Sequence, residues 1–252
     1  MDANELHKGP TAEPVLLLPG LMCDSRVFAA QLSAFPNARA AADYTLERDL
    51  GAMAGRVIDA APARFALLGH SMGGRVALEV IRRVPDRVTR LALLSTGVHM
   101  PTPGEAPKRY ALRDLGRSEG MAALVDAWLP PMVAPDRARD PHFMAPLRAM
   151  CIEAGLARFE AQIAALLSRP EVESLLPHIA CPVLVAAGSE DVWSPPAQHE
   201  AIAALLPDAH LVVVEGAGHM LPVEAPDALN DAIAAWLARP IETPYPSQGE
   251  VE

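Results

Sequence analysis

Gly69-His70-Ser71-Met72-Gly73-Gly74 stands at an abrupt change of sequence pattern. The preceding residues, Arg64–Leu68, have the apolar run of a buried strand, and Arg75–Arg83 have the apolar spacing of an amphipathic helix. A serine in the tight turn between a strand and a helix stands exposed above the edge of a sheet. The flanking glycines allow a strained turn and close packing of helix on strand. Ser71 is therefore a candidate nucleophile, and an ordinary glycine-rich turn is the alternative.

Short apolar runs recur along the chain, and each ends at turn-forming residues. They are continuous rather than alternating, as is typical of parallel strands covered on both faces. Because helical patterns lie between them, we expect an α/β fold with a mostly parallel sheet between two layers of helices. The predicted strands are Pro14–Leu18, Phe65–Leu68, Val88–Leu94, Pro182–Ala187, Leu211–Val214 and, more weakly, Ala38–Ala42. The predicted helices of this part are Val27–Phe35, Gly51–Ala61, Met72–Val84, Pro196–Leu206 and Pro226–Ala238.

One long interval, from Ser95 to Pro182, interrupts this alternation. It contains helical patterns divided by prolines, and a structureless loop of such length is uncommon in a folded domain. We therefore expect a helical insert over the carboxyl edge of the sheet. The predicted organisation is a core in two parts (1–96 and 179–240), a helical cap (97–178) and a Pro-rich, poorly ordered tail (241–252). The predicted cap helices are Lys108–Leu115, Glu119–Leu129, Arg137–Cys151 and Leu156–Leu167.

Composition narrows the function classes. Of the 252 residues, 51% are apolar, and the net charge is −10, which disfavours nucleic acid and anionic membranes as partners. No signal-like segment and no apolar run long enough to span a bilayer are present in the sequence, so no membrane insertion is expected. The three cysteines are scattered and lack metal-ligand spacing, so neither a disulfide framework nor a metal site is predicted. These features favour a cytoplasmic protein without a cofactor. They carry no signal for its oligomeric state.

Two later loops offer a base and an acid for Ser71. A serine hydroxyl is a weak nucleophile near neutral pH and needs a histidine oriented by a carboxylate. His219 follows the predicted strand Leu211–Val214, and Asp191 follows Pro182–Ala187, so both belong to the same edge of the sheet. Glu190 is the alternative acid.

Backbone amides are needed where negative charge develops on the substrate oxygen. We expect one from Met72, at the start of the helix after the serine. The second is expected from the loop after the first strand, and Leu21 is preferred there over Met22. Cys23 in the same loop has no evident base and is interpreted as a packed thiol.

Four segments together resemble the serine-dependent α/β-hydrolase superfamily, in particular its compact, esterase-like members with a four-helix cap. They are Leu18–Asp24, Gly69–Gly74, Gly188–Asp191 and Gly216–His219. The order serine, acid, histidine is the order of that superfamily. The resemblance implies an α/β-hydrolase fold of about six strands that lacks the usual N-terminal hairpin, with a cap after the strand that ends near Ser95. It also implies an acyl-enzyme on Ser71, cleared by water that His219 activates.

The favoured function is hydrolysis of a small-molecule carboxylic ester, thioester or lactone with an apolar acyl group. Soft, apolar residues make an adaptable pocket, and the expected ones are Met22, Trp128, Met132, Trp193 and Met220. Carbon–carbon bond hydrolysis of a diketone-type substrate is the main enzymatic alternative, and acyl transfer or perhydrolysis shares the same acyl-enzyme. A ligand-binding protein with an idle serine site is the non-enzymatic alternative.

Overall fold

Six strands form one open sheet in which every pairing is parallel. The structure, a computed structural model, describes residues 13–41 and 43–241. The strands are β1 (Val15–Leu18), β2 (Ala38–Ala40), β3 (Phe65–His70), β4 (Val88–Leu94), β5 (Val183–Gly188) and β6 (Ala209–Val214). Their order across the sheet is β2-β1-β3-β4-β5-β6. The predicted α/β fold with about six strands is confirmed, and the described sheet is parallel throughout.

The register places the carboxyl ends of neighbouring strands side by side. Leu18 at the end of β1 is aligned with Gly69 of β3, and His70 is aligned with Leu94 at the end of β4. Gly188 at the end of β5 is aligned with Val214 at the end of β6. The loops after these five strands therefore leave the sheet at one edge, where α/β folds place their sites.

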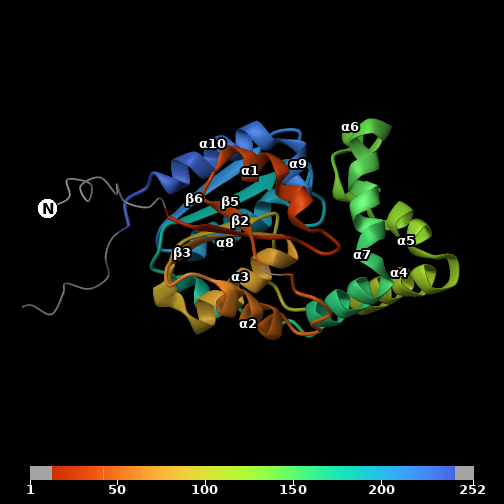
Figure 1. Cartoon of the computed structure of the whole chain (residues 1–252), viewed down its shortest axis with the longest axis horizontal. Helices are drawn as coiled ribbons and strands as arrows, with labels where there is room; N and C mark the ends of the chain where they lie inside the picture. The colour runs from red at the N-terminus through yellow and green to blue at the C-terminus, as the bar shows by residue number, and fades with distance from the viewer. Residues whose placement is uncertain (1–12, 42, 242–252) are drawn as a thin grey trace, which may run out of the picture.

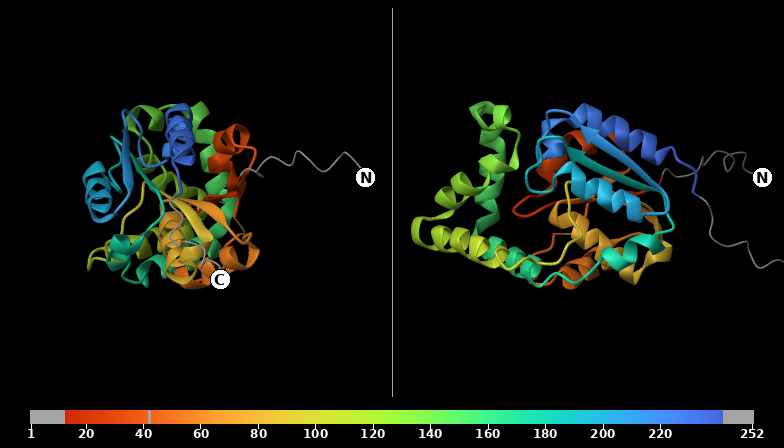
Figure 2. Two further views of the ribbon diagram at one scale, coloured as in Figure 1. Left: turned by 90° about the vertical axis from the view of Figure 1, so that its left-hand side faces the viewer. Right: turned by 180° about the vertical axis from the view of Figure 1, so that it is seen from behind.

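Helices cover both faces of the sheet (Figures 1 and 2). Helices α1 and α10 lie together on one face, α2 packs on α3 at the other, and α8 packs on β5 and β6. The bounds are α1 (Ala29–Ala34), α2 (Leu50–Ala60), α3 (Met72–Arg83), α8 (Pro196–Leu205), α9 (Leu221–Glu224) and α10 (Pro226–Leu237). Each predicted helix of this part is present with ends that differ by a few residues, except that Ser25–Phe28 forms a 3₁₀ turn before α1.

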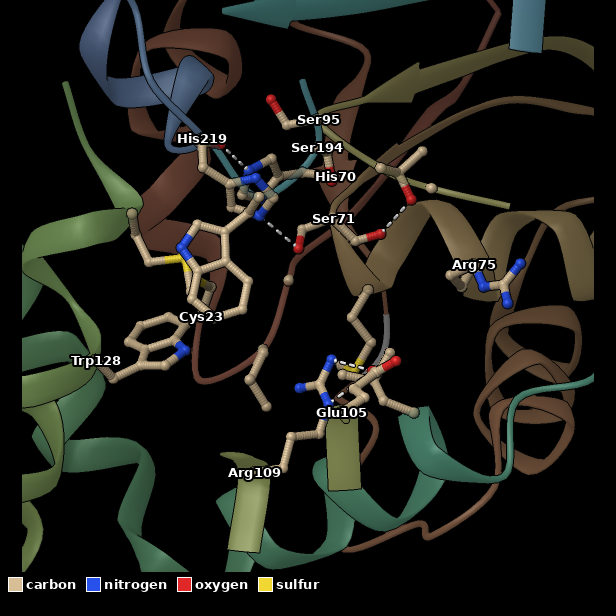
Figure 3. Close-up of a pocket in the computed structure, with 18 of the residues that line it drawn as sticks. Cys23, His70, Ser71, Arg75, Ser95, Glu105, Arg109, Trp128, Ser194 and His219 are labelled. Atoms are coloured by element: carbon tan, nitrogen blue, oxygen red, sulfur yellow. Dashed lines mark hydrogen bonds and ion pairs between the residues drawn. The ribbon is translucent and has the colours of Figure 1, made fainter. Parts of the chain in front are cut away.

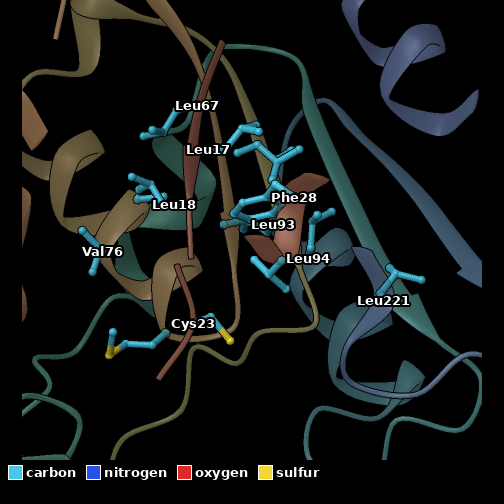
Figure 4. Packing of buried hydrophobic residues seen from close by; sticks show 14 of the residues in the cluster. Leu17, Leu18, Cys23, Phe28, Leu67, Val76, Leu93, Leu94 and Leu221 are labelled. Carbon is cyan, nitrogen blue, oxygen red and sulfur yellow. The ribbon is translucent and has the colours of Figure 1, made fainter. Parts of the chain in front are cut away.

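The core lies between the sheet and these helices. Every residue of β1, β3, β4 and β5 is buried, which explains why their sequences are continuous apolar runs. Figure 4 shows Leu17 beside Phe28, from the turn before α1, on one face of the sheet, and Leu18 and Leu67 beside Val76 of α3 on the other. Burial of this kind, about 25 cal/mol for each Å² of apolar surface, is the main force that holds the strand ends in place.

Four further helices, here called the cap helices, lie together at one end of the molecule (right in Figure 1). They are α4 (Glu105–Glu119), α5 (Met121–Trp128), α6 (Pro135–Ala138) and α7 (Pro141–Leu167). The prediction of one helix over Arg137–Cys151 is wrong. Asp140 caps a new helix by accepting from the amides of His142 and Phe143, and Pro141 occupies its first position.

Helix α7 has a kink at Gly155, whose φ of 77° is outside the helical range. The predicted break between Cys151 and Leu156 corresponds to this kink. Two other predictions, the missing N-terminal hairpin and the poorly ordered tail, concern residues 1–12 and 242–252, which lie outside the described part of the chain. Among the described helices, none is both long and apolar enough to cross a bilayer.

Candidate active site

Ser71 lies in the turn between β3 and α3 with a strained backbone, at φ 55° and ψ −119°. Its amide donates to the carbonyl of Leu94 at 2.9 Å, and its carbonyl accepts from the hydroxyl of Thr96 at 2.8 Å. A Cβ at position 73 would collide with the backbone carbonyl of Leu18. The glycine at this position is thus required by the close approach of α3 to β1, and the turn holds the serine above the sheet.

A continuous chain of hydrogen bonds joins Ser71, His219 and Asp191, and Figure 3 shows its part between Ser71 and His219. Nε2 of His219 lies 2.8 Å from Oγ of Ser71, and Nδ1 of His219 lies 2.9 Å from Oδ2 of Asp191. The carboxylate can only accept, so Nδ1 carries the proton and Nε2 is free to accept from the serine hydroxyl. The structure therefore brings together the three residues that the sequence nominated.

Asp191 is buried, with 2% of its surface exposed, and its charge is well supported. Its Oδ1 accepts from the amides of Trp193 at 2.9 Å and Ser194 at 2.8 Å. Burial opposes ionisation, but the hydrogen bonds from His219 and these amides hold the pKa of Asp191 below its usual range. The neighbouring Glu190 is exposed, and the geometry favours Asp191 as the acid.

Two side chains outside the predicted triad hold the His219 loop. Nε2 of His70 donates to the carbonyl of His219 at 2.8 Å. The buried carboxylate of Glu224 accepts from the amides of Gly218 and Met220, on either side of His219, and from that of Ala134 in the loop before α6. The expectation that His70 packs or supports a loop is confirmed by its bond to the carbonyl of His219. No sequence pattern pointed to Glu224, because its role depends on the backbone amides of Gly218 and Met220 in the preceding loop and of Ala134, 90 residues away.

Both residues expected to supply backbone donors, Leu21 and Met72, line the cavity beside Ser71. Within the described residues, the amides of Leu21 and Met72 donate to no protein acceptor. The amide of Met22, the less favoured candidate, instead donates to Oε1 of Gln162 on α7 at 2.8 Å. Gln162 therefore removes Met22 from consideration as an oxyanion donor and ties this loop to the cap helices.

A cavity opens beside Ser71 between the sheet edge and the cap helices. Four of the five predicted pocket residues line it, namely Trp128, Met132, Trp193 and Met220. The fifth, Met22, does not, because its side chain is fully buried in the core. Sequence reasoning missed Phe159 and Leu166 of α7, since the direction of side chains on an insert helix cannot be read from composition. The charged residues that line the cavity are Arg75, Glu105, Lys108, Arg109 and Arg169.

Other side chains near the site are poor candidates for a nucleophile, a base or a metal ligand. Cys23 lines the cavity, but burial raises the pKa of its thiol well above the ordinary value, so it stays protonated and unreactive. His199 is engaged elsewhere, with Nε2 accepting from the amide of Thr96 at 3.0 Å. Over residues 13–41 and 43–241, no group of three or more His, Cys, Asp or Glu is arranged to hold a metal ion.

Comparison with known proteins finds hydrolases of similar sequence and fold. An esterase from Thermogutta terrifontis, solved with malate bound, is 28% identical with a TM-score of 0.80 and covers 89% of each chain. The enol-lactonase from Burkholderia xenovorans LB400 is 25% identical with a TM-score of 0.80, covering 92% of this chain and 94% of that one. A protein of Caulobacter sp. (strain K31) named "Putative carbamate hydrolase RutD" is 27% identical over 93% of this chain and 95% of its own.

A family model described as "Alpha/beta hydrolase family" matches residues 15–232, which include all six strands, the cap helices and the Ser71, Asp191 and His219 positions. The chain therefore belongs to the alpha/beta hydrolase family and is a hydrolase.

Proposed function

We propose that the protein is a serine hydrolase that cleaves a carboxylic ester, thioester or lactone through an acyl-enzyme on Ser71. The observation that carries this proposal is the unbroken hydrogen-bonded chain from Oγ of Ser71 through His219 to Asp191. The roles are those that such a chain can perform, namely nucleophile, general base and orienting acid.

In the first half of the proposed reaction, Oγ of Ser71 attacks the ester carbonyl carbon while Nε2 of His219 takes the hydroxyl proton. The bond to the leaving oxygen then breaks, and His219 returns that proton to the leaving alcohol. In the second half, a water molecule gives a proton to His219 and attacks the acyl carbon. The carboxylic acid leaves, and Ser71 recovers its proton.

Negative charge forms on the carbonyl oxygen in both halves. The amides of Leu21 and Met72 are the proposed donors, and the start of α3 adds the favourable end of a helix dipole. Removal of one such donor typically costs about 10²–10³ in rate. The Gly20 carbonyl, in the same planar peptide unit as the Leu21 amide, accepts from the amide of Cys23, and Gln162 holds the next amide, that of Met22. These two bonds restrict the direction of the Leu21 amide before substrate binds.

The apolar part of the cavity favours a substrate with an apolar acyl group. The printed names of the two solved relatives, an esterase and an enol-lactonase, agree with an ester or lactone bond. Carbon–carbon bond hydrolysis of a diketone-type substrate stays the main alternative reaction. It is less favoured because related enzymes of that type often carry tryptophan after the catalytic histidine, where this chain has Met220. Acyl transfer to an alcohol or to peroxide differs only in the acceptor.

Labelling and turnover test the proposal together. A fluorophosphonate should modify the wild-type protein at Ser71, and Ser71→Ala should abolish labelling without loss of the folded state by circular dichroism. Wild-type protein should hydrolyse p-nitrophenyl esters of two to eight carbons and leave a panel of diketones intact. A folded protein that binds apolar ligands but is not labelled would be a binding protein. Preferred diketone cleavage would instead establish the carbon–carbon alternative.

A further inference from the structure

The cavity has a second end that differs sharply from the apolar end. Its lining there includes four cationic side chains, those of Arg75, Lys108, Arg109 and Arg169, and one carboxylate, that of Glu105. Figure 3 shows Arg109 and Glu105 across the cavity from Ser71 and His219. This concentration of positive charge contrasts with the chain as a whole, whose net charge is −10.

Glu105 neutralises only part of this charge. Its carboxylate accepts from Arg169 at 2.6 and 2.7 Å and from Arg109 at 2.9 Å. Although burial pushes it upward, these hydrogen bonds bring the pKa of Glu105 down to about 2, so it stays ionised. One carboxylate thus faces two guanidinium groups, while Arg75 and Lys108 form no ion pair with any carboxylate among the described residues.

Arg75 is the most unusual of the four. It lies one helical turn after Ser71 on α3, only 3% exposed, and its guanidinium donates to the carbonyls of Val98 and His99. Its buried Nε has no hydrogen-bond partner among the residues described. Burial, with the charge of Arg169 nearby, lowers the pKa of Arg75 to about 10. The charges of Glu79, Glu105 and Glu171 oppose this shift only in part, and none of these carboxylates forms an ion pair with Arg75. A buried cation without a directly paired carboxylate is costly unless a partner supplies one.

The pKa of His99 is affected by the same cationic side chains. It lines the cavity between these arginines, and burial together with the charges of Arg169 and Arg75 lowers its pKa. A purely structural role explains the pair of Arg169 and Glu105, which joins the end of α7 to the start of α4. It explains Arg109 only in part, because Arg109 shares the single carboxylate of Glu105 with Arg169, and it does not explain the charges of Arg75 and Lys108.

We propose that this cationic end of the cavity is a subsite for a carboxylate group of the substrate. The substrate is then an ester or lactone in which an apolar chain separates the reacting carbonyl from a carboxylate. The inference rests on the proposed function for the position of the reacting bond. Arginine suits the task because its planar, permanently charged fork matches a carboxylate.

Binding to the Ser71→Ala protein tests the subsite without turnover. The ligands are the monomethyl esters of straight-chain dicarboxylic acids with four to eight carbons, each compared with its dimethyl ester by calorimetry. We expect the free carboxylate to bind about tenfold more tightly at one or more chain lengths, because a charge-assisted hydrogen bond is gained. Added salt should reduce that preference.

Arg109→Gln in the same background should remove most of the preference, and Arg109→Lys should keep part of it. Arg113→Gln is the matched control, since Arg113 lies one turn further along α4, pairs with Asp114 and does not line the cavity. Equal binding of monomethyl and dimethyl esters at every length would overturn the subsite, as would equal effects of Arg109→Gln and Arg113→Gln.

Turnover by the wild-type protein separates this proposal from the proposed function. If dimethyl esters are hydrolysed and the Ser71→Ala protein shows no preference for the carboxylate, the subsite is wrong and the serine hydrolase stands. If the carboxylate preference is measured but no ester is hydrolysed, the subsite stands and the proposed reaction is wrong.

Discussion

The sheet core and the cap helices contribute opposite walls of one cavity, and they are held in different ways. In the core, Ser71 is fixed by the backbone hydrogen bond to Leu94, and Asp191 by two amides of its own loop. The cap contributes Trp128 and Phe159, which are placed by packing between helices. Backbone bonding fixes positions to a fraction of an ångström, whereas packed apolar side chains can adjust. The comparison suggests that the core performs the reaction and the cap selects the substrate.

The core side of this comparison is tested most severely by Ser71→Ala. Because the acyl-enzyme can no longer form, kcat for every ester should fall by about 10⁴–10⁶. Steady-state kinetics on a short and a long acyl ester should show the same loss for both. A variant that lost only the long ester would place selection, rather than the reaction, at Ser71.

Asp191→Asn should have the next largest effect. The amide cannot hold His219 in the tautomer that accepts the serine proton, and kcat should fall by about 10²–10⁴ with little change in KM. Glu190→Gln is the matched control, since Glu190 is the exposed neighbour in the same loop. Similar losses in the two variants would mean that the loop as a whole, and not the Asp191 carboxylate, is responsible.

Gln162 is a cap residue that contacts the loop of the proposed oxyanion donor, so it departs from the division between a reacting core and a selecting cap. Gln162→Leu tests this exception. Loss of its carbonyl leaves the buried Met22 amide without an acceptor and loosens the neighbouring Leu21 amide. We expect kcat to fall by about tenfold for short and long esters alike, with a stability loss of about 1–3 kcal/mol.

A stability measurement by denaturant unfolding checks that Gln162→Leu is folded in the assay. The conservative Gln162→Glu keeps the acceptor and should retain more activity than Gln162→Leu. If Gln162→Leu changes only the preference for acyl chain length, then Gln162, like the other cap residues, acts in substrate selection and not in the reaction.

Trp128→Ala should alter selection without disabling the reaction. It removes a large apolar surface from the cap wall, and binding to such a surface is worth about 1–3 kcal/mol for each matching group. We expect the ratio of kcat/KM for an eight-carbon ester to that for a two-carbon ester to fall about fivefold. An equal loss for both esters would show that Trp128 instead positions the reacting groups.

The smallest expected effect concerns stability in the core. Burial, with His219 beside it, lowers the pKa of His70 from 6.5 to about 4. The unfolded chain therefore binds this proton as pH falls below about 6.5, but the folded chain does not until about pH 4. The contribution of neutral His70 to the free energy of unfolding is therefore complete above pH 6.5 and decreases as the pH falls towards 4.

Denaturant unfolding at pH 7 and pH 5 measures this effect. The wild-type protein should lose about 1–2 kcal/mol more than His70→Gln over that interval, at about 1.4 kcal/mol for each pH unit below 6.5. Equal losses in the two proteins would show that other groups set the acid sensitivity of the core.

Sequence patterns predicted the core far better than the cap. Continuous apolar runs identified β1, β3, β4 and β5, because burial on both faces leaves a strong local signature. The edge strand β6 was identified from its apolar run although only its last residue, Val214, is buried. The loops after those strands nominated Ser71, Asp191 and His219. Met22 was placed in the pocket wrongly, since its side chain is buried in the core while its backbone amide donates to Gln162, 140 residues away. Glu224 and the cationic end of the cavity depend on similarly distant contacts.

The parallel sheet also constrains how the protein reaches its working state. Ser71 and His219 are 148 residues apart in the chain, and they meet only when β6 has joined the edge of the sheet beside β5. Pairing across such separations forms slowly, because loop closure must precede it. Refolded chains should therefore regain helical content before they regain activity. During synthesis the last strand completes the site, so a chain released before residue 219 holds a nearly complete sheet without its base.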